Sequence, residues 1–339
     1  MSRACRRIFL PRHASRLPDP RFDARGAPPL VHIGYHKTGT SWLQRQLFRN
    51  ADVGFHSSGK GQGTPVTSLV AARPLDFDVE RSREEFAVAL AAARKAKLVP
   101  VVSLERLSGH PLSGGYDSKE LAERLHAVLP DARILGVFRE QNAMIASTYK
   151  QYVKTGGPSS LERFLAPPVQ RHRRIPMLDH RHFEYDRLLV FYRTLFGAEN
   201  VLFIPYEWFA SAPESFVRRI AEFAGADPPE DAIRGLPFEQ RANVGQSAIT
   251  TAISRRLNRL FVLTDVNPNP LVDAPRITRA FRRAVPAADR LPSVVIERSE
   301  RRLRNRISTL IGDRYGESNA RLSRLTGVDL EPYGYVVLP

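Results

Sequence analysis

The chain has 339 residues, of which 42% are hydrophobic and 25% charged, and its formal net charge is +16. These proportions lie in the ordinary globular range and allow a sizeable core, and the length does not require two domains. The single cysteine, Cys5, excludes an intramolecular disulfide and a cysteine metal cluster.

The positive charge has two explanations, a solvated basic surface or an attraction for anionic ligands and surfaces. The 51 Lys and Arg residues are scattered along the chain rather than gathered into one tract. The sequence also holds no zinc-finger spacing, RNA-binding motif or basic zipper. We therefore expect no nucleic-acid partner, and both explanations of the charge stay open.

Residues 1–28 form a basic, Pro-rich segment that we expect to be flexible. Its apolar stretch IFL is far shorter than a signal-peptide core and is followed at once by Pro11. No run in the chain approaches the ~18 apolar residues of a membrane span. With one cysteine and no transmembrane segment, the sequence predicts a soluble, cytoplasmic protein.

Apolar runs of strand length then alternate with helical patterns. PLVHIGY predicts a strand and a Gly-bearing loop before a helix, and residues 51–78, rich in Gly, Ser, Thr and Pro, predict a long surface loop. Further strands are expected at LVPVVSL, ARILGVF and VLFIPY, and further helices over 83–97, 118–129, 183–196 and 213–224. This alternation predicts an α/β fold with a central parallel sheet flanked by helices.

Helical patterns dominate beyond Gly245, over residues 247–263 and 293–310, and the only candidate strand there is the final run YGYVVL. We interpret residues 246–335 as a C-terminal helical cap continuous with the core. The expected organisation is thus a single domain over residues 29–339.

The segment GYHKTGTS has the layout of a phosphate-binding loop between a strand and a helix, because Gly34 and Gly39 bracket four residues. Backbone N–H groups at the start of the helix would face an anion there. A Walker loop has its lysine immediately after the second glycine, but Thr40 holds that place and Lys37 comes earlier. This shift argues against an ordinary kinase or ATPase. A solvated turn is the alternative.

At these residues the sequence resembles the sulfotransferase superfamily. The 5'-phosphosulfate loop of that family carries a lysine, a small hydroxyl residue, a glycine and two hydroxyl residues, and these places are filled by Lys37, Thr38, Gly39, Thr40 and Ser41. The resemblance implies a P-loop-type three-layer fold and 3'-phosphoadenosine-5'-phosphosulfate (PAPS) as co-substrate. It also implies that the loop holds the 5'-phosphate while Lys37 reaches the departing phosphate oxygen.

A second candidate anion site follows the third predicted strand, whose run ends in VFRE. Arg139 stands at the carboxyl end of that strand, where ligands bind in open α/β sheets. The family's 3'-phosphate motif is an Arg at a strand end with a Ser eight residues later, often followed by a Tyr, which Arg139, Ser147 and Tyr149 match. Gln141 departs from the proline of many members and puts the local turn in question. Alternatively, Arg139 pairs with Glu140 or another surface acid.

Two more residues are candidate nucleotide contacts by resemblance. Trp42 occupies a place where some members stack an aromatic ring on adenine, although packing in the core explains it equally well. Arg241, in QRANVGQS, lies where the family places a late loop that contacts the 3'-phosphate. The ending RYGESNARLSRLTGVDLEPYGY resembles bacterial sulfotransferases, so the resemblance spans residues 29–337.

A general base must take the acceptor proton, and Glu105 is our first candidate because it follows the second predicted strand at the carboxyl edge. His36 and His56 are alternatives, since some family members use Glu and others His and a neutral imidazole serves near pH 7. Glu105 could instead form a surface pair with Arg106 or Arg139. We expect no metal, because the histidines of HRHFE lack a third ligand and sulfuryl transfer needs none.

These inferences predict a PAPS-dependent sulfotransferase acting on an acceptor hydroxyl. By analogy with soluble bacterial enzymes that it resembles, we expect the acceptor to be a saccharide or glycolipid. Two alternatives remain: a divergent P-loop nucleotide kinase, and a non-catalytic module that binds polyanions or glycans. A kinase needs an acidic residue at a strand end to hold Mg²⁺, where this chain instead offers Glu105 and Arg139.

Overall fold

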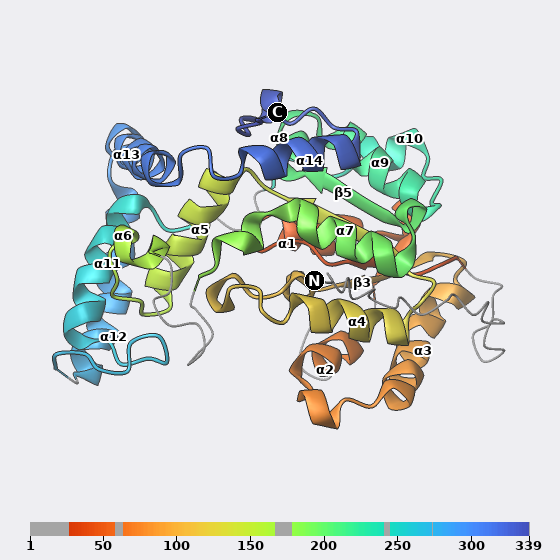
Figure 1. Ribbon diagram of the computed structural model, residues 1–339, viewed down its shortest axis with the longest axis horizontal. Helices are drawn as coiled ribbons and strands as arrows, with labels where there is room; N and C mark the ends of the chain where they lie inside the picture. The colour runs from red at the N-terminus through yellow and green to blue at the C-terminus, as the bar shows by residue number, and fades with distance from the viewer. Residues whose placement is uncertain (1–26, 58–63, 167–177, 241–244, 273, 339) are drawn as a thin grey trace, which may run out of the picture.

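The computed structural model describes residues 27–57, 64–166, 178–240, 245–272 and 274–338, and the structural statements below concern these residues. Its centre is a parallel sheet in the order β2-β3-β1-β4-β5 (Figure 1). The strands are β1 (Leu30–His32), β2 (Phe55–Ser57), β3 (Val99–Ser103), β4 (Arg133–Phe138) and β5 (Val201–Pro205). Nearly every strand residue is buried, as expected for a parallel sheet covered on both faces.

Successive residues of the strands point to opposite faces and enter two separate cores. Val31 and Ile134 lie in the larger core, whereas Leu30 and Leu135 lie in the smaller one. The larger core is covered by α3 (Val79–Lys95), α4 (Ser118–Val128), α7 (Tyr185–Phe196) and α14 (Gly316–Thr326). The smaller core is covered by α1 (Thr40–Trp42), the π-helical turn Leu43–Leu47, α9 (Pro213–Ala224) and α10 (Glu230–Arg234). The three-layer α/β prediction is therefore correct.

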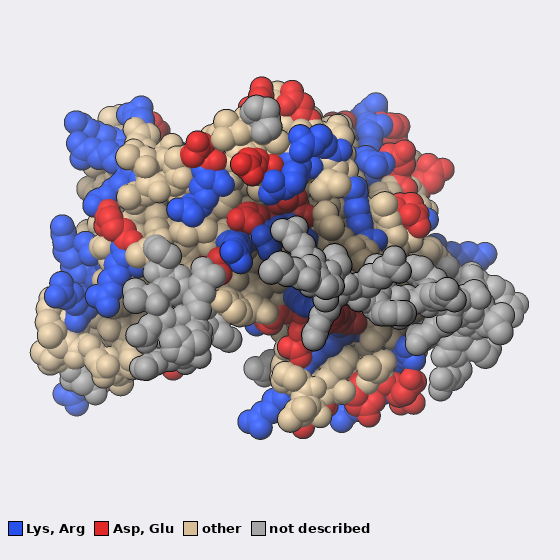
Figure 2. Space-filling model, in the orientation of Figure 1, with Lys and Arg blue, Asp and Glu red and all other residues tan. Residues whose placement is uncertain are grey.

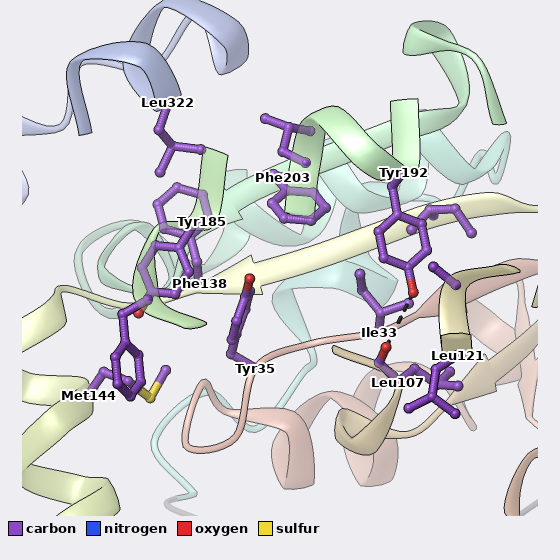
Figure 3. Packing of buried hydrophobic residues seen from close by; sticks show 14 of the residues in the cluster. Ile33, Tyr35, Leu107, Leu121, Phe138, Met144, Tyr185, Tyr192, Phe203 and Leu322 are labelled. Carbon is purple, nitrogen blue, oxygen red and sulfur yellow. Dashed lines mark hydrogen bonds between the residues drawn. The ribbon is translucent and has the colours of Figure 1, made fainter. Parts of the chain in front are cut away.

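The larger core is rich in tyrosine. The hydroxyl of Tyr192 donates a hydrogen bond to the Leu107 carbonyl at 3.3 Å, which ties α7 to the turn after β3 (Figure 3). Tyr35 and Tyr185 meet edge to face with ring centroids 4.6 Å apart. Because Tyr35 comes shortly after β1, this packing supports the loop that begins there.

A helical cap stands beside the sheet, at the left in Figure 1. It consists of α5 (Gln141–Lys154), α6 (Leu161–Leu165), α11 (Ala248–Phe261), α12 (Pro275–Ala284) and α13 (Ser293–Ile311). The Lys150 ammonium on α5 lies 2.6 Å from the Glu300 carboxylate on α13, and the Asn258 amide on α11 donates to the carbonyls of Val153 and Gly157. These contacts join α11 and α13 to α5, which itself continues from the sheet.

The sequence prediction was wrong in two segments. The expected surface loop over 51–78 contains the edge strand β2 and the helix α2 (Pro65–Ala71), in which Val66 and Leu69 are buried. Both elements are too short to give a clear periodic pattern. The final run YGYVVL is not a strand, because it has no strand partner and packs instead against α14, where the Leu338 amide donates to the Gly316 carbonyl.

Candidate active site

The loop after β1 is positioned by β4. The Tyr35 amide donates to the Val137 carbonyl at 3.0 Å, which extends the pairing of the two strands beyond His32. Continuing this register places His36 beside Arg139, and the register of β1 with β3 places Gly34 beside Glu105. The topology therefore brings the three segments singled out in the sequence to one edge of the sheet.

The loop itself is tightly wound. Lys37 and Gly39 have φ values of 69° and 76°, in the left-handed region, and the Thr38 hydroxyl donates to the Tyr35 carbonyl at 2.5 Å. Positive φ is uncommon for a residue with a side chain, so the surrounding structure holds Lys37 in a conformation that costs energy. The first bonds of the following helix are donated by Trp42 and Leu43 to the Gly39 carbonyl, so the helix does not use the amides before them.

Glycine at position 39 is required for a second reason. A Cβ built there would lie 2.9 Å from Cε2 of Tyr206, closer than carbon atoms approach. Tyr206 is the first residue of α8 (Tyr206–Ser211), directly after β5, and the guanidinium carbon of Arg139 lies 5.3 Å from its ring centroid. One aromatic ring thus contacts the loop and faces the arginine. Sequence reasoning missed Tyr206, although an aromatic residue at the end of the predicted strand VLFIPY was a usable signal.

The two candidate anion-binding segments are in direct contact. Arg139 Nη1 donates to the Lys37 carbonyl at 3.2 Å, and Lys37 Nζ donates to Gln151 Oε1 on α5 at 3.0 Å. Ser147, half-buried, precedes Gln151 by one helical turn and therefore lies on the same face of α5. The loop, the strand-end arginine and the helix serine line one edge of the sheet.

Positive charge is concentrated at this edge. Burial lowers the pKa of Lys37, and the nearby Lys154 and Arg139 lower it further, whereas Glu105 acts in the opposite direction. Cations that repel one another in this way are stabilised by an anion bound between them. The Thr40 hydroxyl is also buried without a hydrogen-bond partner among the described residues, as expected of a donor that awaits a ligand.

Arg139 does not form the surface ion pair considered as an alternative. The Glu140 carboxylate instead caps α5 by accepting from the amides of Asn142 and Ala143, both at 2.8 Å, and burial raises its pKa. Burial also raises the pKa of Glu207, which accepts from the Glu140 amide and the Tyr335 hydroxyl. Within the described part of the chain, Arg139 forms no ion pair with a carboxylate. Its guanidinium thus remains available for an anion.

Gln141, which departs from the proline of many sulfotransferases, has a structural role. Its buried side chain donates to Asn319 Oδ1 at 2.6 Å and to the Phe183 carbonyl at 3.4 Å. The start of α5 is thereby tied to α14. This turn is held by an amide network rather than by the fixed φ of a proline.

Glu105 begins the 3-10 turn Glu105–Ser108, directly after β3. Its Oε2 is buried without a hydrogen-bond partner among the described residues, and its neighbour Arg106 pairs with Asp117 instead. The Ser108 hydroxyl is 3.0 Å from both the Glu105 and the Gly34 carbonyls, which fixes the turn against the loop. The structure therefore places a carboxylate, the group expected of a general base, at the edge of the sheet near Lys37.

His36 is less suited to this role. Its ring is buried edge-on against His110, with centroids 5.1 Å apart, and burial followed by the charges of His110, Arg106 and Lys37 lowers its pKa to about 3. A group with so low a pKa is a weak general base at neutral pH. His56 lies on the edge strand β2 in register with Pro100, several residues short of the sheet edge that carries Glu105. The geometry favours Glu105.

The remaining predicted residues lie elsewhere. Trp42 is 4% exposed, stacks on Phe238 with centroids 5.5 Å apart and donates to the Pro237 carbonyl at 3.1 Å. This placement favours the core-packing alternative over adenine stacking. Arg241 falls outside the described residues.

The histidines of HRHFE have structural contacts. The His180 ring bonds to the Tyr315 hydroxyl and the Leu165 carbonyl, and His182 packs on Tyr35 with centroids 5.3 Å apart. Within the described ranges there is no cluster of three His, Cys, Asp or Glu that could hold a metal ion. The helices of the same ranges include none with the length and apolar character needed to span a membrane.

Comparison with known proteins agrees with this arrangement. The profile of the sulfotransferase family matches residues 118–230, a stretch that includes Arg139 and Ser147. The fold is similar to the crystal structure of a sulfotransferase from Alicyclobacillus acidocaldarius, at 18% identity and a TM-score of 0.50, over 90% of this chain and 98% of that one. Residues 118–230 therefore resemble the sulfotransferase family, and the chain shares the fold of a known sulfotransferase.

Two further structures are similar to a smaller part of this chain. They are the sulfotransferase domain of the Synechococcus PCC 7002 olefin synthase and that of the curacin biosynthetic pathway, each at 13% identity and a TM-score of 0.37. They cover 62% and 60% of this chain, and 78% and 77% of their own chains. No curated protein matches the sequence.

Proposed function

We propose that the protein is a sulfotransferase that uses PAPS as donor and binds it along the sheet edge formed by the loop Lys37–Ser41, Arg139 and Ser147. The observation that carries the proposal is the hydrogen bond between Arg139 and the Lys37 carbonyl, which places two groups suited to anions side by side. PAPS carries a phosphosulfate at one end of its ribose and a phosphate at the other. The loop suits the 5'-phosphosulfate, and Arg139 with Ser147 suits the 3'-phosphate.

The proposed reaction is an in-line transfer. The acceptor hydroxyl oxygen forms a bond to sulfur, the bond from sulfur to the 5'-phosphate oxygen breaks, and the hydroxyl proton passes to Glu105. Lys37 stabilises the charge that appears on the leaving phosphate oxygen. Positioning and preorganised charge supply most of the rate enhancement in such transfers.

We propose a saccharide, free or on a glycolipid, as the acceptor. A cavity of about 350 Å³ adjoins the site at Ser108, the residue that fixes Glu105 against the loop. Its lining includes the rings of Tyr35, His182 and Phe191 together with polar and charged side chains, which are Ser118, Lys119, Asp179, Arg181, Glu184 and Arg187. Hydrogen-bonding groups beside aromatic rings suit a ligand rich in hydroxyls.

A donor-labelled screen tests the proposal. Purified protein with ³⁵S-labelled PAPS is offered sugars, glycolipids and phenols, and we expect label to enter a saccharide. Transfer only to phenols would exclude the saccharide while leaving sulfuryl transfer intact. No transfer to any acceptor, together with no saturable binding of adenosine 3',5'-bisphosphate, would favour the non-catalytic polyanion-binding module.

A further inference from the structure

The far end of the helical cap exposes a group of large apolar side chains. Leu271 is 70% exposed, Leu263 56% and Val272 53%. We call this group the cap tip, and it consists of Leu260, Leu263, Leu271, Val272 and Ile277. An exposed apolar group of this kind on a soluble protein marks a site of interaction.

The cap tip is held by specific bonds. The Val272 amide donates to the Leu260 carbonyl at 2.9 Å, which joins the loop after α11 to the end of that helix. The Asn267 side chain donates to the carbonyls of Asn258 and Val262 at 2.8 and 2.7 Å and closes the turn from inside. The backbone therefore holds the apolar side chains of the cap tip in a fixed arrangement at the surface.

Two half-buried aromatic side chains join α11 to α12. Phe261 and Phe281 pack with ring centroids 5.7 Å apart, and the Thr278 hydroxyl donates to the Phe261 carbonyl at 2.6 Å. These contacts do not involve the exposed side chains of the cap tip.

Arginines are frequent in the helices that carry the cap tip. Between Ala248 and Ile311 the sequence has thirteen arginines and five acidic residues, and in Figure 2 blue side chains gather on the left side of the molecule, above the mostly tan lower left corner. Arg276, Arg279 and Arg283 are exposed along one face of α12, and Arg259 is exposed on α11. In the described part of the chain these four form no ion pair with an acidic side chain, although the exposed Asp265 lies in the adjoining turn.

The same combination of apolar surface and arginines continues along α11. A cleft of about 430 Å³ between α11 and α13 is lined by Ile249, Ile253 and Leu303, and Arg256 and Arg302 also contribute to it. The cap thus offers apolar contact and positive charge together at two neighbouring places.

We propose that the cap tip docks on the surface of an anionic lipid bilayer. Its apolar side chains lie in the headgroup boundary, and the neighbouring arginines of α11 and α12 contact the lipid phosphates. Exposed apolar side chains beside a basic helix face suit this interface. A second copy of the chain fits less well, because two arginine-rich surfaces would repel each other. Soluble polyanions would use the arginines but leave the apolar residues without a role. This proposal is independent of sulfuryl transfer.

Vesicle co-sedimentation tests the proposal with the full chain. Vesicles of phosphatidylcholine alone are compared with vesicles that also contain phosphatidylglycerol, each at low and high salt. The double variant Leu263→Asn, Val272→Asn removes apolar contact without changing charge, and Arg276→Gln, Arg279→Gln removes charge. Leu75→Asn is the matched control, because Leu75 is 99% exposed on the turn Pro74–Asp76, away from the cap.

We expect binding to the anionic vesicles only, weakened by salt as surface charge is screened. The affinity of the apolar variant for anionic vesicles should be lower by about tenfold or more. The affinity of the arginine variant should be lower by about fivefold for each charge removed, and the Leu75 variant should bind like the wild type. Circular dichroism checks that each variant is folded. Absence of binding to anionic vesicles would overturn the proposal. So would a dimer in light scattering that the apolar variant alone dissociates, since it would assign the cap tip to self-association.

Discussion

Lys37 combines a left-handed backbone, a hydrogen bond to α5 and a lowered pKa. If it stabilises the leaving phosphate oxygen, Lys37→Ala should lower kcat by about 10²-fold to 10³-fold, the range for loss of one preorganised charge donor. Lys95→Ala, at an exposed position on α3, is the control and should leave the rate unchanged. Steady-state transfer assays measure both, and full turnover by the Lys37 variant would remove its assigned role.

Glu105 has a buried oxygen without a partner among the described residues. Replacing it with glutamine keeps the shape but removes the proton acceptor, so we expect turnover to fall by about 10²-fold or more while nucleotide affinity is retained. Glu84→Gln, exposed on α3, provides the matched control. Calorimetry and transfer assays separate the two quantities. Unchanged turnover would return the assignment to His36 or His56.

His36 makes the stability of the fold depend on pH. Its pKa of about 3 lies below the ordinary value of 6.5, so between these values the unfolded chain binds a proton that the folded protein does not. The free energy of unfolding should therefore fall as the pH decreases through this window, by up to about 1.4 kcal/mol per pH unit for this ring. Urea unfolding at pH 7 and pH 5 measures the difference. His36→Asn should reduce it, and an undiminished difference would contradict the burial argument.

At the scale of elements, an amide network joins α5 to α14 at the position where many sulfotransferases have a proline. Gln141→Ala removes the partner of the buried Asn319 side chain, and we expect the free energy of unfolding to fall by about 1 to 3 kcal/mol. Gln46→Ala, which removes an exposed bond to Gln240, should have little effect. If Gln141→Ala and Asn319→Ala prove additive in a double-mutant cycle, the two side chains are not coupled.

Element prediction succeeded where periodicity extended over many residues. The helix α4 and the strand β4 were foreseen because one shows a helical pattern and the other a continuous apolar run. The strand β2 was not, because its three residues gain order from pairing with β3 rather than from their own pattern. The final run YGYVVL has the composition of a strand, but a strand forms only with a partner.

At the scale of the whole molecule, parallel topology explains why the candidate site could be anticipated. Strand ends of a parallel sheet share one edge, so Lys37, Glu105 and Arg139 were expected near one another from their places after predicted strands. Tyr206 and the buried histidines around His36 could not be anticipated, because their contacts depend on side-chain packing between distant segments. The burial of Trp42 could not be anticipated either, because its ring stacks on Phe238, which is distant in the sequence.

The central claim is that one nucleotide is bound at its two ends by the loop and by Arg139. Calorimetric titration with adenosine 3',5'-bisphosphate and with adenosine 5'-monophosphate, on the wild type and on Arg139→Ala, tests it most directly. We predict that the variant loses about tenfold to a hundredfold in affinity for the bisphosphate, the scale of a hydrogen bond to a charged group, and keeps its affinity for the monophosphate. An equal loss for both ligands, or none for either, would contradict the account.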